Sequence, residues 1–389
     1  GLGAIAITGA LNLDAAIASA TSLSVSTTSD LGANVTTSST QTYTGAVTLS
    51  GGTRTLTAST VNFGSTVDGG TNALIITGAL DLDGAATGLT TLSVSGTSNL
   101  GANVTTSSTQ TYSGNATISN NITLTTTNSN VSFGGTTNAG TAGNTLTVAA
   151  GTGDVTFTNA VGGTTAMGNM TITTGALSAA AIKVQGTIDI TNSDTSSITG
   201  IISDGASSAI LTKAGSGTLT LSANNTYTGA TTISAGTISI SADSGLGTAP
   251  GSVVADHLTI NGGTLNTSST FSLATNRGIT IGANDATIDV DGSTTLSYAG
   301  AITGSGDLTK TGDGTLNLTG STDFSGSTTI GAGGLGLSDV LPSGTDLTVT
   351  GTLNLLASFT VNTLSGSGNV NLSSYNLTIS NGSSSDDTT

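Results

Sequence analysis

The sequence lacks cysteine, tryptophan and glutamate altogether, and it has only two prolines among its 389 residues. Without cysteine the chain forms no disulfide bond, which suits a protein that must stay unfolded during export. Apart from alanine and leucine, the strong helix-forming residues are almost missing. We therefore expect almost no helix, with residues 175–184 (GALSAAAIKV) as the one candidate segment.

Positive charge is equally scarce. The chain has 5 Lys+Arg against 21 acidic residues, all of them aspartate, for a formal net charge of −16. This argues against nucleic acid as a partner, because no basic patch exists to neutralise phosphates. Attachment to an anionic bilayer is not supported either, because it would also require a cluster of basic residues. No run of about 18 apolar residues is present to span a membrane.

Glycine is abundant, with 57 residues, and it alternates with serine, threonine and short aliphatic pairs. The segment 211–240 shows the pattern: Leu219 and Leu221 lie two residues apart, and so do Ile238 and Ile240. In a β-strand this spacing places both members of a pair on one face. Glycines mark the corners between strands of about five residues. A disordered chain, the alternative for so polar a composition, lacks this density of alternating aliphatic residues.

Most other segments are imperfect copies of this unit. Residues 308–337 repeat residues 211–240 at a displacement of 97, and residues 7–45 recur at 76–114, displaced by 69, with 29 of 39 positions identical. Self-similarity at this scale is typical of a solenoid or a propeller. Neighbouring Gly-Thr-Leu/Ile steps, such as those at Gly217, Gly236 and Gly263, follow one another at short and uneven intervals, whereas propeller blades would be longer and more regular.

These spacings predict an all-β fold, a parallel β-helix (β-solenoid) of roughly 16–20 coils with about 20 residues each. The 69-residue duplication then corresponds to about three coils. Because residue usage is uniform from end to end, we expect one continuous solenoid instead of several globular domains. Its regions are duplicated coils (1–138), irregular coils (139–204), coils with the 211–240 type of repeat (205–380) and a flexible tail (381–389).

Several motifs resemble a known family. The segments 211–238 (LTKAGSGTLTLSANNTYTGATTISAGTI), 258–266 (LTINGGTLN), 276–290 (NRGITIGANDATIDV) and 304–320 (GSGDLTKTGDGTLNLTG) look like the passenger-associated repeats of bacterial autotransporters and related large adhesins. The likeness covers roughly residues 205–340. It implies a right-handed parallel β-helix, export across the outer membrane and a stalk or adhesive role at the cell surface. No translocator barrel or secretion domain is recognisable, so we expect an internal or processed piece of a longer protein.

Two aspartate pairs are the candidate metal ligands. Asp81 and Asp83 lie two residues apart, as do Asp289 and Asp291. Paired carboxylates hold Ca²⁺ when carbonyl oxygens complete the shell. The aliphatic residues that alternate with these aspartates claim the inward face, so we expect both pairs to face solvent and to bind no metal.

The basic residues do not form a catalytic constellation. Enzymes built on β-helices need clustered carboxylates with a basic residue, or paired acids near a sugar. Lys213 and Lys310 occupy equivalent repeat positions, which favours a role at the coil edge, and His257 is predicted to be a surface or corner residue. The remaining basic residues are far apart: Arg54, Lys183 and Arg277. We therefore assign no catalytic, cofactor-binding or metal-binding residue, and we expect no enzymatic activity.

The aromatic residues Tyr43, Tyr112, Tyr227 and Phe324 share one repeat-equivalent place, each with a glycine two residues later. They are candidates either for packing between coils or for a carbohydrate platform. Since they come from coils separated by tens of residues, one contiguous patch is not expected, and packing is the favoured interpretation.

The sequence thus indicates a non-catalytic structural stalk of a secreted bacterial surface protein. The alternative is a subunit of a self-assembling extracellular fibre or surface layer, in which the ends or flanks of the β-helix pair with other chains. A host or surface receptor, or a polysaccharide, is a further candidate partner.

Overall fold

The computed structural model describes residues 2–338, 341–342 and 344–381. Short parallel β-strands make up its regular structure, and the 3-10 helix η1 (Asp243–Leu246) is the one helix in these ranges. The strands form a β-solenoid of about 19 turns, which confirms the predicted fold. The chain divides into two compact units, unit 1 (Gly1–Ala209) and unit 2 (Ile210–Thr389). The predicted tail lies outside the described residues, apart from Asn381.

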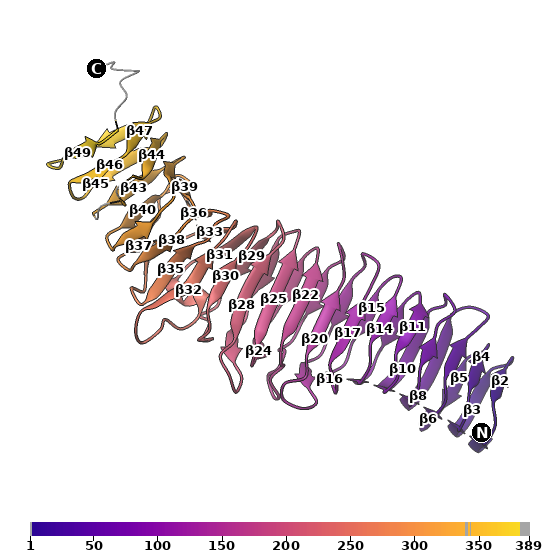
Figure 1. The fold of residues 1–389 in the computed structure, drawn as a ribbon. Coiled ribbons are helices and arrows are strands. Elements are labelled where there is room, and N and C mark those ends of the chain that lie inside the picture. The colour runs from indigo at the N-terminus through magenta and orange to yellow at the C-terminus, as the bar shows by residue number, and fades with distance from the viewer. Residues whose placement is uncertain (1, 339–340, 343, 382–389) are drawn as a thin grey trace. The chain divides into compact units, whose positions relative to one another are not determined.

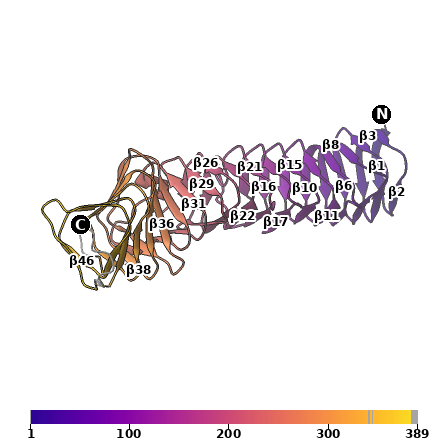
Figure 2. The same cartoon turned by 90° about the horizontal axis from the view of Figure 1, so that it is seen from above.

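Unit 1 is a stack of coils with three faces, and successive coils pair through parallel strands (Figures 1 and 2). Face a consists of β2 (Leu11–Leu13), β4 (Ser29–Leu31), β7 (Val47–Leu49), β9 (Val67–Asp68), β11 (Ala86–Leu89), β14 (Val104–Thr106), β17 (Ile122–Thr125), β20 (Leu146–Ala149), β22 (Met170–Thr174) and β25 (Thr187–Asn192). Face b holds β5 (Val35–Thr37), β12 (Leu92–Val94), β15 (Gln110–Tyr112), β18 (Val131–Phe133), β21 (Val155–Phe157), β23 (Leu177–Ala179) and β26 (Ser196–Ile198). Face c holds β1 (Leu2–Ile7), β6 (Thr40–Tyr43), β13 (Ser98–Leu100), β16 (Ala116–Ile118), β19 (Thr137–Ala139), β24 (Ile182–Val184) and β27 (Ile202–Asp204). Three longer strands run across the corner from face b to face c: β3 (Ile17–Val25), β8 (Arg54–Phe63) and β10 (Leu74–Leu82).

Alternation along each strand builds the core of unit 1. In β12, Leu92 and Val94 are buried while Ser93 between them is half-buried on the outside. The inward residues of successive coils lie directly above one another, as the register of Leu92 with Gln110 shows. Parallel strands stack at roughly 4.8 Å. Each inward side chain therefore packs against its counterparts in the coils above and below.

The corners depend on two recurring devices. Asparagine side chains accept a backbone N–H from the next coil: Asn34 Oδ1 accepts from Thr55 at 3.0 Å, and Asn103 Oδ1 accepts from Thr123 at 2.7 Å. Glycine is required where one coil crosses close above another. A Cβ on Gly45 would lie 2.4 Å from the carbonyl carbon of Thr27, so no larger residue fits there without a shift of the backbone.

Unit 2 is built in the same way from three parallel sheets. Face d holds β28 (Ile210–Ala214), β30 (Thr231–Ile233), β32 (Val254–Ile260), β35 (Arg277–Ile281), β38 (Ile302–Gly304) and β41 (Thr322–Phe324). Face e holds β29 (Thr218–Leu221), β31 (Thr237–Ile240), β33 (Thr264–Thr267), β36 (Ala286–Val290), β39 (Leu308–Thr311), β42 (Thr328–Ile330), β44 (Asp346–Val349) and β47 (Thr363–Ser365). Face f holds β34 (Phe271–Leu273), β37 (Thr295–Tyr298), β40 (Thr315–Leu318), β43 (Gly334–Leu337), β45 (Thr352–Leu355) and β48 (Asn369–Asn371), and β46 (Phe359–Val361) pairs with β49 (Leu377–Ile379).

The 69-residue duplication places its two copies on different faces of unit 1. Tyr43 on face c pairs in register with Phe63, which pairs with Leu82 and then Leu100, so three coils carry the chain only from position 43 to position 100. Tyr112, the repeat equivalent of Tyr43, lies beyond that point on face b. The duplication therefore spans three coils and two further faces, which corrects the expectation of about three coils.

The 97-residue repeat of unit 2 is displaced in the same manner. Leu219 lies on face e, and the register leads from it through four coils to Lys310 on the same face. Leu316, the equivalent of Leu219, follows on face f. The three faces are interchangeable for such a motif because each takes a short strand with inward side chains two residues apart and a similar corner.

The prediction of a helix at 175–184 is wrong. This segment forms β23 and β24, whose residues pair with strands of the neighbouring coils. Leu177 and Ala179 are buried on face b, and Ile182 and Val184 are buried on face c. Stacking on existing strands satisfies the backbone and buries both aliphatic pairs, which overrides the helix preference of the four alanines.

Candidate functional site

The repeat-equivalent aromatic residues all lie in the core. Tyr43, Tyr112, Tyr227 and Phe324 are at most 1% exposed. In unit 1 they stack on aromatic rings of the next coil, with centroids 5.4 Å apart for Tyr43 and Phe63 and 5.0 Å apart for Tyr112 and Phe133. This confirms the packing interpretation, because a side chain buried in this way offers no face to a sugar.

A buried glutamine accompanies each of the two tyrosines of unit 1. Gln41 Nε2 donates to the carbonyl oxygens of Val35 at 3.1 Å and Thr57 at 2.9 Å, while its Oε1 accepts from the Tyr43 hydroxyl at 3.1 Å. Gln110 and Tyr112 repeat the arrangement on another face. Burial raises the pKa of both tyrosines far above its ordinary value. The pairs bridge coils and have no exposed reactive group.

The aspartate pairs face outward, as their spacing predicts. Leu80, Leu82, Ile288 and Val290 alternate with them and are buried. In unit 2 the pair is tied together by one amide, because Asn266 Nδ2 donates to Asp289 Oδ2 at 3.0 Å and to Asp291 Oδ1 at 2.8 Å. Among the described residues, no group of three His, Cys, Asp or Glu is arranged to hold a metal ion.

The two repeat-equivalent lysines point inward. Lys213 and Lys310 have fully buried side chains, in phase with the core residues Leu211 and Leu308. Only the ammonium groups reach the coil edge: Lys213 Nζ donates to the carbonyl oxygens of Ala214 at 2.6 Å and Gly215 at 2.9 Å. Lys310 makes the equivalent bonds. Burial lowers the pKa of each lysine to about 8. The predicted coil-edge role thus holds for the charged end alone.

The expectation that His257 is a surface or corner residue is wrong. Its side chain is buried, and Nδ1 lies 3.0 Å from Nη1 of Arg277, whose side chain is also fully buried. Arg277 forms an ion pair with Asp243, with 3.1 Å between Nε and Oδ1. This contact is not apparent from the sequence, because 34 positions separate Asp243 from Arg277. One signal was present, since Arg277 is in phase with the inward Ile279 and Ile281.

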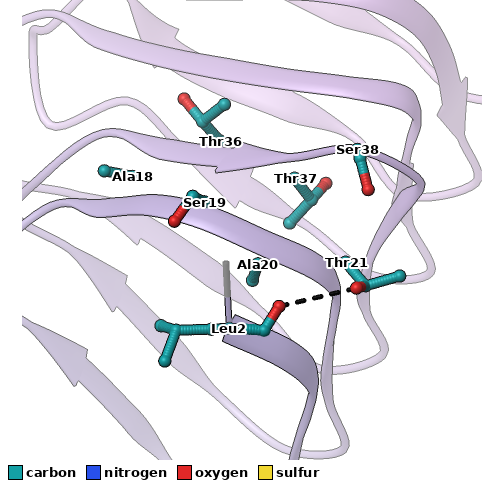
Figure 3. Close-up of a pocket in the computed structure, with 8 residues that line it drawn as sticks. All are labelled: Leu2, Ala18, Ser19, Ala20, Thr21, Thr36, Thr37 and Ser38. Carbon is teal, nitrogen blue, oxygen red and sulfur yellow. Dashed lines mark hydrogen bonds between the residues drawn. The ribbon is translucent and has the colours of Figure 1, made fainter.

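Two open grooves lie at corners of unit 1, at equivalent places in the two copies of the duplication. The first has a volume of about 470 Å³ and the second about 210 Å³. The first is lined by Leu2, Ala18, Ser19, Ala20, Thr21, Thr36, Thr37 and Ser38 (Figure 3), and the second by Thr71, Gly88, Leu89, Thr105, Thr106, Ser107 and Thr127. Neither lining contains a charged or titratable side chain. These grooves offer hydroxyl groups for hydrogen bonds, but no general base or activated nucleophile.

Comparison with known proteins agrees with this geometry. The passenger-associated-transport-repeat family matches residues 211–240 and 308–337. A stretch of 117 residues, 30% of this chain, is 36% identical to the adhesin BmaC autotransporter of Brucella suis biovar 1 (strain 1330). That stretch spans 3% of the adhesin's length. No solved structure matches the chain. The resemblance to autotransporter passengers with passenger-associated transport repeats is thereby confirmed.

The described part of the chain contains no helix with the length and apolar character that a membrane crossing requires.

Proposed function

We propose that this chain, which carries passenger-associated transport repeats, is a non-catalytic structural stalk of a secreted bacterial cell-surface protein. The placement of the repeats carries the proposal. Copies of each repeat lie on different faces of their unit, although their inward side chains pack alike. An array of binding sites gains from equivalent residues stacked on one face, whereas a stalk needs only coils that continue to stack.

The basic residues support a role without catalysis. Five of the six are buried in the core: Arg54, Lys213, His257, Arg277 and Lys310. Their polar atoms are used internally, as in the bond of 2.8 Å from Arg54 Nε to the Ser50 carbonyl oxygen. A general acid or base must come within hydrogen-bond reach of its substrate, and these groups do not face solvent. The adhesin relative supports export to the cell surface as the setting.

The second candidate function is a subunit of a self-assembling extracellular fibre or surface layer. It is favoured by exposed apolar side chains in and beside β48 and β49 of unit 2, among them Leu372 at 44% and Ile379 at 43%. A coil from another chain packed against these strands would cover them.

Negative-stain electron microscopy and analytical ultracentrifugation of the purified chain separate the two. The stalk predicts discrete monomeric particles whose sedimentation does not change between low and high micromolar concentrations. Filaments that lengthen with concentration would overturn the stalk in favour of the fibre. The double variant Leu372→Ser with Ile379→Ser is the matched control, since it should abolish filaments if β48 and β49 form the contact and should leave discrete particles unchanged.

A further inference from the structure

One coil of unit 2 is longer than its neighbours. The register pairs Leu219 with Ile238 and Ile238 with Leu265, so the second of these coils takes the longer stretch of chain. The extra residues lie between the end of β31 and Leu258 in β32. We define them as the excursion, residues 241–257, which contains η1 and the first four residues of β32. Val253 in this excursion is 63% exposed. Backbone hydrogen bonds hold part of this segment, from the Asn225 N–H to the Ser244 carbonyl oxygen at 2.9 Å and from the Thr248 N–H to the Tyr227 carbonyl oxygen at 2.8 Å.

Arg277 adds a buried side-chain attachment from the next coil. Its Nε and Nη2 donate to the two carboxylate oxygens of Asp243, at 3.1 and 3.3 Å. Nη1 donates to the carbonyl oxygen of Leu246 at 2.8 Å, and Nη2 donates to that of Gly247 at 2.8 Å. These two carbonyls belong to the end of η1. The guanidinium group, fully buried, thus holds the start of the excursion at three residues.

The remaining contact of Arg277 fixes the protonation state of His257. An arginine can only donate, so His257 Nδ1, which lies 3.0 Å from Nη1, must be an unprotonated acceptor. The proton of the neutral ring is then on Nε2, which donates to the Thr228 carbonyl oxygen at 3.3 Å. Both ring nitrogens are engaged only in this neutral tautomer.

We propose that Arg277, His257 and Asp243 form an acid-sensitive clasp, which releases the excursion 241–257 from its coil when His257 gains a proton. A protonated imidazole carries N–H at both nitrogens, so Nδ1 can no longer accept from Arg277. Two cations would then face each other at hydrogen-bond distance in a buried site. The ring reaches water only if the strand segment that carries it moves away from Arg277.

The charges around His257 determine the direction of the effect. Burial and the charge of Arg277 on β35 disfavour the protonated ring, whereas Asp243 in η1 and Asp256 on its own strand favour it. The first two prevail and lower the pKa of His257 below its ordinary value of 6.5. In the released state the ring is in water and titrates near that value. The released state therefore binds more protons, and the clasp loses stability as the pH falls below about 6.5 through the lowered pKa.

The chain has one histidine, so its imidazole resonance in an NMR titration needs no assignment. The clasp predicts a pKa below 6.5. It also predicts that amides in 241–257 lose protection between pH 7.5 and 5.0, after correction for the intrinsic effect of pH on exchange. Amides of β36 in the neighbouring coil should keep their protection. A ring that titrates at or above 6.5, or an excursion equally protected at both pH values, would overturn the proposal.

A matched variant separates the clasp from general acid loosening. In His257→Asn the side-chain oxygen takes the acceptor place of Nδ1 but does not titrate in this range. The clasp predicts that exchange in the excursion of this variant is the same at pH 7.5 and 5.0. Acid-induced loss of protection equal to that of the parent chain would contradict it. If the variant does not fold, the titration and exchange of the parent chain still decide the matter.

Discussion

The hydroxyl groups of Tyr227 and Thr231 share a hydrogen bond of 2.7 Å inside unit 2, and the second copy of the repeat lacks this bond. The equivalent residues 97 positions later are Phe324 and Thr328. Because phenylalanine has no hydroxyl group, the buried Thr328 Oγ1 has no hydrogen-bond partner among the described residues. A buried polar group without a partner costs about 1–3 kcal/mol.

This difference predicts opposite effects of one substitution in the two copies. Thr328→Val should raise the free energy of unfolding, or leave it unchanged, because it removes an unpaired hydroxyl at nearly constant volume. Thr231→Val should lower it by about 1–3 kcal/mol, since the buried Tyr227 hydroxyl loses its partner. Urea unfolding of both variants measures the contrast. Equal losses in both would show that the two threonines have the same environment.

The inward and outward faces of β29 predict a second contrast. Leu219→Asp places a charge in the core without a partner and should cost several kcal/mol, enough to unfold its coil and loosen its neighbours. Thr220→Asp should be nearly silent, because this side chain points outward. Thermal melting and limited proteolysis of both variants provide the measurement. If Thr220→Asp were as damaging as Leu219→Asp, the assignment of the faces would be wrong.

The buried lysines predict a dependence of stability on alkaline pH. Burial lowers the pKa of Lys213 and Lys310 to about 8, whereas in the unfolded chain the value is near 10.5. Between these values the unfolded chain holds protons that the native chain has released, so the free energy of unfolding rises with pH in this window. The urea midpoint of the parent chain should therefore rise between pH 7.5 and 9.5, relative to the urea midpoint of the double variant Lys213→Met with Lys310→Met. Lys183→Met, at a half-buried position, is the control and should behave as the parent chain.

The modular coils predict which deletions unit 1 tolerates. Leu100 pairs in register with Ile118, so deletion of residues 101–118 removes one whole coil and joins equivalent positions. This variant should keep its strand content by circular dichroism and its resistance to proteolysis. Deletion of 101–109 joins the end of β13 directly to the start of β15, without β14 and without a corner between two faces, and should cause local unfolding. Equal damage from both deletions would show that the coil is not the structural unit.

Alternation made much of the fold predictable from sequence. Pairs such as Leu219 and Leu221 indicate an inward face in any strand, and short intervals between glycine corners indicate stacked coils. The same rule, applied to charged residues, would have placed Lys213 in phase with Leu211 on the inward side. Only the general expectation that lysine is exposed argued otherwise.

The faces and the clasp were not predictable in this way. Coil length depends on corner geometry, and the step in register from Leu100 to Ile118 is shorter than the next step, from Ile118 to Ala139. The number of residues between two copies of a repeat therefore does not reveal how many faces of the coil separate them. His257 lies where the register of β32 shifts between Val254 and Leu258, so alternation gives no face for it.

The central claim is that the coils have the observed register, which moves repeat copies between faces. Since the chain has no cysteine, pairs of introduced cysteines test it by disulfide formation without background. Thr42 is in register with Asn62, and Ser93 is in register with Thr111. We predict that Thr42→Cys with Asn62→Cys, and Ser93→Cys with Thr111→Cys, form disulfides on mild oxidation, because neighbouring strands lie at roughly 4.8 Å. If Thr42→Cys instead pairs with Ser65→Cys, the position that three equal coils in each copy of the duplication would require, the account is contradicted.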